Sequence, residues 1–103
     1  VNNNGIDILT SESEMARAVF NGEVTRVISV PNFNNVVIIR HGEFLSVYSN
    51  LDDVLVQKGD KVITKQPIGR VYTDSEENKT EMHFEIWKGK ELQNPSYWLS
   101  RQK

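Results

Sequence analysis

The chain has 103 residues, of which 38% are hydrophobic and 25% charged, and its formal net charge at pH 7 is −2. This length allows one domain with a single modest core, and the balanced charge without a basic block argues against nucleic acid as a partner. No apolar run approaches the roughly 20 residues of a membrane-spanning helix. The absence of cysteine excludes disulfides and thiolate metal sites and leaves the redox compartment open.

Short runs rich in apolar and β-branched residues, separated by turn signals, recur along the whole chain and predict strands. They are residues 5–8, 17–20, 23–30, 36–40, 44–49, 67–72 and 81–87. Residues 56–62 predict a strand, a turn and a second strand. Asn21-Gly22 is typical of a hairpin turn, so the strands on its two sides are expected to pair with each other. Residues 36–40 predict a strand that is buried on both faces.

The segments between these runs are short and offer little helix. Residues 11–18 are the only candidate helix, in competition with the strand at 17–20. Residues 51–55 are expected to form a short helical or irregular turn, and residues 73–80 a polar loop. Residues 94–99 are expected to form a closing turn. The sequence therefore predicts an all-β sandwich or barrel-like sheet with little or no helix.

The run at 81–87 alternates between polar and apolar side chains, as a strand with one buried face does. This alternation predicts that Glu81, His83, Glu85 and Trp87 share one face. Met82, Phe84 and Ile86 are expected on the other face. If His83 faces a groove, Trp87 lies on the same side and is placed to anchor a partner.

Several sequence blocks occur in an order and spacing that resemble one known domain. They are Gly5-Ile6-Asp7-Ile8, Ala18 to Val24, Val37 to Gly42, Val47 to Leu51, Val56 to Val62, Lys65 to Gly69, His83-Phe84-Glu85-Ile86 and Asn94-Pro95. Together these blocks resemble the LytM, or lysostaphin-type, peptidase domain over residues 1–103. The resemblance implies an antiparallel β-sheet or sandwich with a surface groove that holds a cell-wall peptide in active relatives.

The resemblance also indicates which positions carry the chemistry in active members. A zinc ion is held there by a His, by an Asp four residues later and by the second His of an H-x-H strand, while two further histidines assist proton transfer. Here the ligand positions read Asn3, Asp7 and His83. The helper positions read Asn50 and Glu81.

These replacements predict that the zinc site and the hydrolase activity are lost. A neutral Asn amide is a poor zinc ligand, and Asp7 with His83 gives only two ligands, where a catalytic site needs three. Asn50 cannot act as a base near neutral pH. His41 matches no ligand position and is expected to be a turn residue with local hydrogen bonds. We therefore expect no cofactor and no enzyme activity.

Degenerate members of the resembled family, of the EnvC or NlpD type, are murein hydrolase activators, and the resemblance is closest to the EnvC type. It implies a protein partner, an N-acetylmuramoyl-L-alanine amidase, that is bound through the emptied groove during daughter-cell separation. It also implies export to the periplasm or cell envelope and an upstream coiled coil. The expected groove surface is Asn3, Asn4, Asp7, Arg17, Asn50, Glu81, His83 and Trp87.

Three alternatives stay open at the level of sequence. The domain is either an amidase activator, a catalytically dead module that binds peptidoglycan, or a zinc peptidase with Asp7, Glu81 and His83 as an atypical ligand set. Residues 56–62 with residues 66–69 also resemble half of a lipoyl or biotinyl carrier motif. The modified Lys on an exposed hairpin, which that motif requires, is missing.

Overall fold

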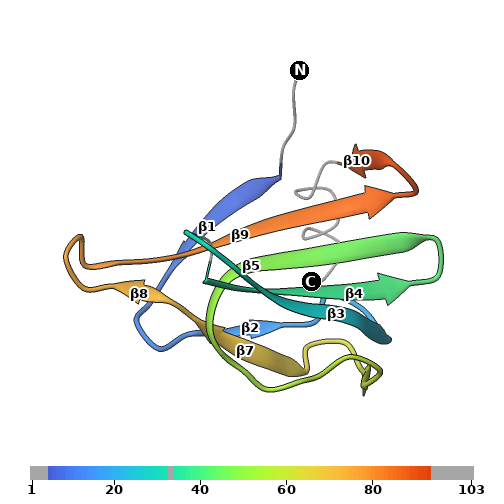
Figure 1. The fold of residues 1–103 in the computed structure, drawn as a ribbon, viewed down its shortest axis with the longest axis horizontal. Coiled ribbons are helices and arrows are strands. Elements are labelled where there is room, and N and C mark those ends of the chain that lie inside the picture. The colour runs from blue at the N-terminus through green and yellow to red at the C-terminus, as the bar shows by residue number, and fades with distance from the viewer. Residues whose placement is uncertain (1–4, 33, 94–103) are drawn as a thin grey trace.

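The computed structural model describes residues 5–32 and 34–93, and its described part is built from strands joined by turns (Figure 1). The strands are β1 (Ile6–Thr10), β2 (Met15–Arg17), β3 (Gly22–Val30), β4 (Asn34–His41), β5 (Phe44–Val54), β6 (Lys61–Val62), β7 (Pro67–Val71), β8 (Thr73–Asp74), β9 (Lys79–Lys88) and β10 (Glu91–Gln93). No helix occurs among these residues, so none that is long and apolar enough to cross a membrane is found there. The expected all-β fold is confirmed.

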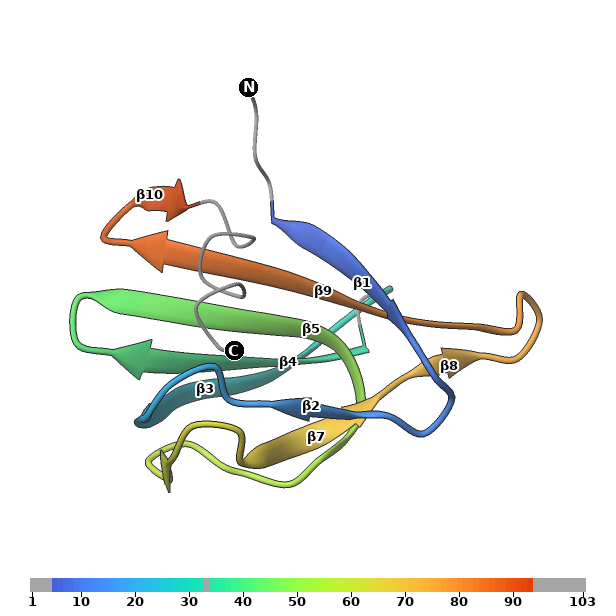
Figure 2. The same cartoon turned by 180° about the vertical axis from the view of Figure 1, so that it is seen from behind.

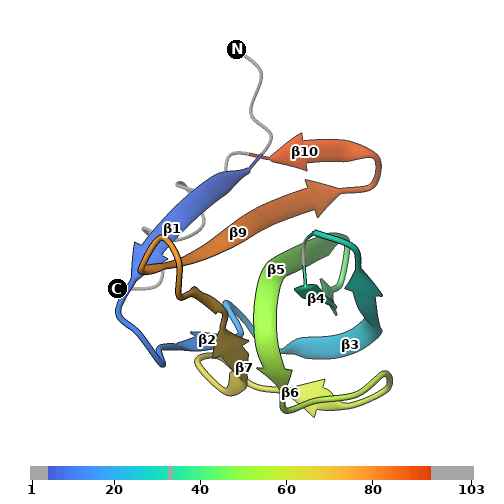
Figure 3. The same ribbon diagram turned by 60° about the vertical axis from the view of Figure 1, so that its left-hand side comes forward.

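All strand pairs are antiparallel, and the main sheet runs in the order β1-β9-β5-β4-β3-β6. The 11-residue strand β5 joins this sheet to a second layer, since its first part pairs with β4 and β9 and its last part with β7. β7 in turn pairs with β2. Figures 2 and 3 show β2 and β7 side by side, with β5 curving toward them. The chain therefore forms a strongly bent, sandwich-like sheet.

The hydrophobic core lies between the two layers. Its buried members are Ala16, Ala18, Val19, Val24, Val37, Ile39, Tyr48, Leu51, Val56, Val62, Ile68, Val71, Phe84 and Ile86. The rings of Tyr48 and Phe84 pack at 5.2 Å between centroids. The Tyr48 hydroxyl also accepts a hydrogen bond of 3.1 Å from the backbone N–H of Val19. Burial raises the pKa of Tyr48 to about 12, so this hydroxyl stays neutral and holds the layers together over the physiological range.

Strand β9 has one buried face and one open face, as its alternation predicts. Phe84 and Ile86 are buried in the core and Met82 packs against it. His83 and Trp87, at the intervening positions, are only partly buried. Residues directly opposite each other on antiparallel strands share a face, so the partners of His83 and Trp87 also belong to the open face of the main sheet.

The predicted hairpin at Asn21-Gly22 is wrong, because β2 pairs with β7 and not with β3. Asn21 instead accepts hydrogen bonds on its side chain from the backbone N–H and the hydroxyl of Thr64. A Cβ atom at Gly22 would lie 2.4 Å from the Arg40 carbonyl oxygen. Gly22 therefore allows β3 to pack closely on β4, and Asn21 binds the turn before β7.

Three further expectations are corrected. Residues 11–14 form a turn, with a 3.1 Å hydrogen bond from Glu14 N to Ser11 O, instead of starting a helix. Residues 51–54 continue strand β5, where Asp52 and Asp53 point to solvent and bind Arg70. Residues 73–80 form the β8–β9 hairpin, in which Thr73 lies opposite Thr80. The closing turn expected at residues 94–99 lies outside the described residues.

Candidate functional site

Four of the predicted groove residues meet in one hollow of about 210 Å³, lined by Asp7, Asn50, Glu81 and His83. The strand register explains why residues so distant in sequence converge. Asp7 on β1 lies opposite His83 on β9, and His83 lies opposite Ser49 on β5. The hollow therefore sits where β1, β9 and β5 run side by side on the open face. We call it the His83 cleft.

A chain of hydrogen bonds runs along β9 beside this cleft. His83 Nδ1 lies 2.7 Å from Asp7 Oδ1, and His83 Nε2 lies 2.8 Å from Glu85 Oε2. The other Glu85 oxygen accepts a 2.8 Å hydrogen bond from Trp87 Nε1. Glu85 thus orients both His83 and Trp87. Sequence reasoning placed Glu85 on this face but gave it no role, although its spacing of two residues from each partner was the available signal.

The position of His83 between two carboxylates favours its charged form. Partial burial lowers the pKa of His83, but the hydrogen bonds to Asp7 and Glu85 and the attraction of their charges raise it by more, so the pKa lies above its ordinary value. The protonated ring donates one hydrogen bond to each carboxylate. His83 therefore ties the edge strand β1 to β9 most firmly when it is protonated.

Asn50, which the family resemblance predicts at one helper position, is held in place by both polar atoms of its amide. Its oxygen accepts a 2.6 Å hydrogen bond from Asn34 Nδ2, and its Nδ2 donates to the carbonyl oxygen of Glu81. Its backbone is left-handed, with φ 72°, a conformation that Asn tolerates better than most residues. Asn50 is thus a brace between β4, β5 and β9, and an amide has no basic atom for proton transfer.

Glu81, which is predicted at the other helper position, lies opposite Leu9 of β1, and its carboxylate is 3.4 Å from Lys79 Nζ. A second hollow of about 200 Å³ adjoins the His83 cleft through Glu81 and Asn50. Its lining residues are Asn32, Asn34, Asn50, Tyr72, Asp74, Glu77, Lys79 and Glu81. The two hollows together form a polar cleft with more carboxylates than cations.

The remaining predicted groove residues divide into three groups. Trp87 belongs to the open face but lines neither of these two hollows. Arg17 lies on β2, in the layer with β7, and donates a 3.0 Å hydrogen bond to the Lys65 carbonyl oxygen. Its neighbour Ala16 faces the core, so the structure does not bring Arg17 to the His83 cleft. Asn3 and Asn4 lie outside the described residues.

His41 is a structural residue at the end of β4. Its Nδ1 lies 2.8 Å from the Asn21 carbonyl oxygen, and its Nε2 lies 2.7 Å from the hydroxyl of the buried Ser46. Burial lowers the pKa of His41 below its ordinary value, against a smaller opposing effect of the hydrogen bond to Asn21. The neutral ring donates from Nδ1 to the carbonyl and accepts the Ser46 proton at Nε2.

Among the described residues, no group of three or more His, Cys, Asp or Glu side chains is placed to hold a metal ion. The side chains with metal-ligating atoms on the open face near the cleft are Asp7, Glu81, His83 and Glu85. Each is already engaged with another side chain, as the His83 contacts and the Lys79–Glu81 pair describe. The arrangement is that of a hydrogen-bonded network of protein groups.

The fold and the cleft define the class of protein. The model of peptidase family M23 matches residues 1–95, and the chain belongs to this family. The solution structure of lysostaphin superposes with a TM-score of 0.84 at 19% identity, over 95% of this chain and 43% of that one. That likeness shows the shared fold.

Curated relatives include proteins that are named as activators. The chain is 30% identical over 98 residues to the murein hydrolase activator EnvC of Escherichia coli K12, and the matched region covers 94% of this chain and 23% of EnvC. It is 33% identical over 100 residues to the murein hydrolase activator NlpD of the same strain, and the matched region covers 94% of this chain and 26% of NlpD. The chain thus spans about a quarter of the length of these relatives.

Proposed function

We propose that this chain is the partner-binding domain of a non-catalytic murein hydrolase activator, which stimulates an N-acetylmuramoyl-L-alanine amidase in the cell envelope. The observation that carries the proposal is the set of residues that line the His83 cleft. The family resemblance assigns Asp7 and His83 as the two zinc ligands that remain and Asn50 and Glu81 to the helper positions, and all four residues line this cleft. The names of the relatives EnvC and NlpD support the same function.

The chemistry of the donor set does not fit a catalytic zinc ion. Such a site needs three protein ligands and an open position for water, and here the first ligand position is Asn3. The ligands that remain bind each other and Glu85. With Asn50 braced by its neighbours, the cleft also has no second histidine to move protons.

The open face is suited to hold a segment of another protein. It combines a polar cleft with the partly buried ring of Trp87, whose orientation is fixed by the hydrogen bond to Glu85. Ordered aromatic side chains are frequent anchors at interfaces, and a groove with an apolar anchor and a polar rim fits a partner helix. Activation then follows if the domain binds the active conformation of the amidase more tightly than the inactive one.

The direct test measures dye release from labelled peptidoglycan by purified amidases of the source organism, with and without this domain. We expect no release by the domain alone and a faster release by one amidase when the domain is added. If no amidase is stimulated, the proposal is rejected. Retention of the domain on isolated sacculi without any stimulation would support a peptidoglycan-binding module instead.

Variants of the open face test the assigned surface. Trp87→Ala and His83→Ala are expected to lower the stimulation while the domain stays folded, as checked by urea unfolding. Leu55→Ala is the matched control, because Leu55 is 57% exposed and follows β5 at the end that pairs with β7. Full stimulation by both Trp87→Ala and His83→Ala would refute the assigned surface. The upstream coiled coil stays a prediction that a longer sequence will test.

A further inference from the structure

Cross-strand pairing places basic residues on the same open face as the His83 cleft, toward the opposite edge of the sheet. Trp87 lies opposite Leu45, and Leu45 lies opposite Arg40. Since opposite residues in antiparallel pairs share a face, one row of side chains crosses the sheet. Across β10, β9, β5, β4, β3 and β6 this row is Leu92, Trp87, Leu45, Arg40, Glu23 and Lys61.

The neighbouring row has the same polarity. It runs across β9, β5, β4 and β3 as Glu85, Val47, Ile38 and Arg26. Arg26, Arg40 and Lys61 are exposed, and none of them belongs to an ion pair within residues 5–32 and 34–93. Glu23 is the one acidic residue at this end of the two rows.

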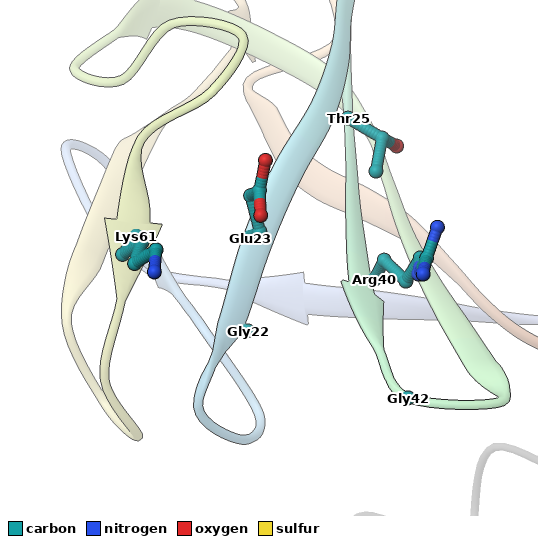
Figure 4. A pocket seen from close by; sticks show the side chains of 6 residues that line it. All are labelled: Gly22, Glu23, Thr25, Arg40, Gly42 and Lys61. Carbon is teal, nitrogen blue, oxygen red and sulfur yellow. The ribbon is translucent and has the colours of Figure 1, made fainter.

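A hollow of about 400 Å³ marks this basic end (Figure 4). Its lining residues are Gly22, Glu23, Thr25, Arg40, Gly42 and Lys61. Figure 4 shows that they come from β3, β6, β4 and the turn that follows β4. The hollow has room for partner side chains beside the two cationic groups.

The other end of the open face is acidic. The His83 cleft and the adjoining hollow hold the carboxylates of Asp7, Asp74, Glu77 and Glu81, against the single ammonium group of Lys79 and the ring of His83. Between the two ends lie apolar side chains of intermediate exposure. They are Ile38, Leu45, Val47 and Trp87.

We infer that the open face binds one elongated segment of the partner in a single orientation, with its basic end at the His83 cleft and its acidic end at Arg26, Arg40 and Lys61. This inference rests on the proposed function. The reverse orientation would bring like charges together at both ends, and such contacts are what electrostatic complementarity excludes. From β9 to β6 the face spans four strand spacings, roughly 19 Å at about 4.8 Å each, or about 13 residues of helix.

The experiment measures binding of the full domain to the amidase that it stimulates, by surface plasmon resonance at low and high salt. Arg26→Glu with Arg40→Glu is expected to weaken binding by about tenfold or more, and Glu77→Lys at the acidic end by about fivefold, chiefly through slower association. Both effects are expected to shrink in high salt. Arg17→Glu is the control in the β2–β7 layer, with the same charge change as each single substitution of the double variant, and we expect it to bind within about twofold of the wild type.

The outcomes distinguish a failure of the proposed function from a failure of this inference alone. If the wild-type domain stimulates no amidase, the proposed function fails, and the inference fails with it. If the wild-type domain stimulates the amidase but both open-face variants bind like the wild type, only the inference is overturned. Tighter binding by the Arg26→Glu, Arg40→Glu variant would also overturn it, because the polarity would then be reversed. Restored binding by an amidase whose acidic segment residues are changed to Lys would confirm it.

Discussion

The replacement of Asn50 by Ala tests whether Asn50 is a structural brace. The change removes the hydrogen bond from Asn34 and the hydrogen bond to the Glu81 carbonyl oxygen. At about 1 kcal/mol each, these bonds contribute roughly 2 kcal/mol. Asn50 also has φ 72°, and Ala in a left-handed conformation costs about 1–2 kcal/mol. We therefore expect Asn50→Ala to lower the free energy of unfolding by about 3 kcal/mol.

Asn50→Gly separates the two contributions. Glycine loses the same hydrogen bonds but adopts a positive φ without strain, so its loss is expected to be about 1 kcal/mol smaller than that of Ala. Urea unfolding monitored by tryptophan fluorescence measures both variants, and a loss of about 3 kcal/mol shifts the midpoint by roughly 1–3 M for a small domain. Equal stability of the two variants would refute the strain component. A loss below about 0.5 kcal/mol for both, within the range of ordinary surface changes, would refute the brace.

Three other changes test the structure by urea unfolding. The pKa of His83 is raised on folding, so its contribution to the free energy of unfolding should be complete below about pH 6.5 and be lost as the pH rises through the raised pKa. The difference in free energy of unfolding between wild type and His83→Gln is therefore expected to shrink from pH 5.5 to pH 8.5. An increase of this difference would contradict a raised pKa. Gly22→Ala is expected to cost about 2–3 kcal/mol by overpacking, since its Cβ would lie 2.4 Å from the Arg40 carbonyl oxygen. Gly42→Ala, with open space around its Cβ and φ 67°, should cost about 1 kcal/mol from backbone strain alone. Equal losses would refute the packing argument. Tyr48→Phe leaves a buried backbone N–H without its acceptor and should cost about 1–3 kcal/mol, and an unchanged midpoint would show that the amide finds another partner.

The features that sequence predicted well are those set by local pattern. The alternation along residues 81–87 fixes which side chains of β9 face the core, and the burial of Phe84 and Ile86 confirms it. The position of Asp7 near His83 followed from the family resemblance, and the β1–β9 register gives its physical basis. Once β1 pairs with β9, a carboxylate and an imidazole on opposite residues are held within hydrogen-bond reach.

The features that sequence missed depend on long-range pairing or on contacts between side chains. Asn21-Gly22 carries a genuine local turn signal, but the pairing of β2 with β7 is decided by burial of Ala16 and Ala18 in the core. The sequence did not predict that β5 continues through Asp52 and Asp53, because their ion pairs with Arg70 on β7 are long-range contacts that no local rule shows. The basic end of the open face could not be predicted from local pattern, since its residues come from three strands and are brought together only by the pairing register of those strands.

Zinc binding is the measurement that bears most directly on the remaining metallopeptidase alternative. Because the family resemblance predicts that only Asp7 and His83 are retained as zinc ligands, we expect protein purified without chelator, incubated with zinc and dialysed, to hold well below one equivalent of the metal by elemental analysis. Stable catalytic sites use three protein ligands. Glu81 shares the open face with His83 but lies near Lys79, so its recruitment would require that ion pair to break. One tightly held zinc ion that is lost in Glu81→Gln would refute this expectation and establish the ligand set Asp7, Glu81 and His83. Retention of the same zinc in Glu81→Gln would place the third ligand elsewhere and would equally contradict a cleft kept for a protein partner alone.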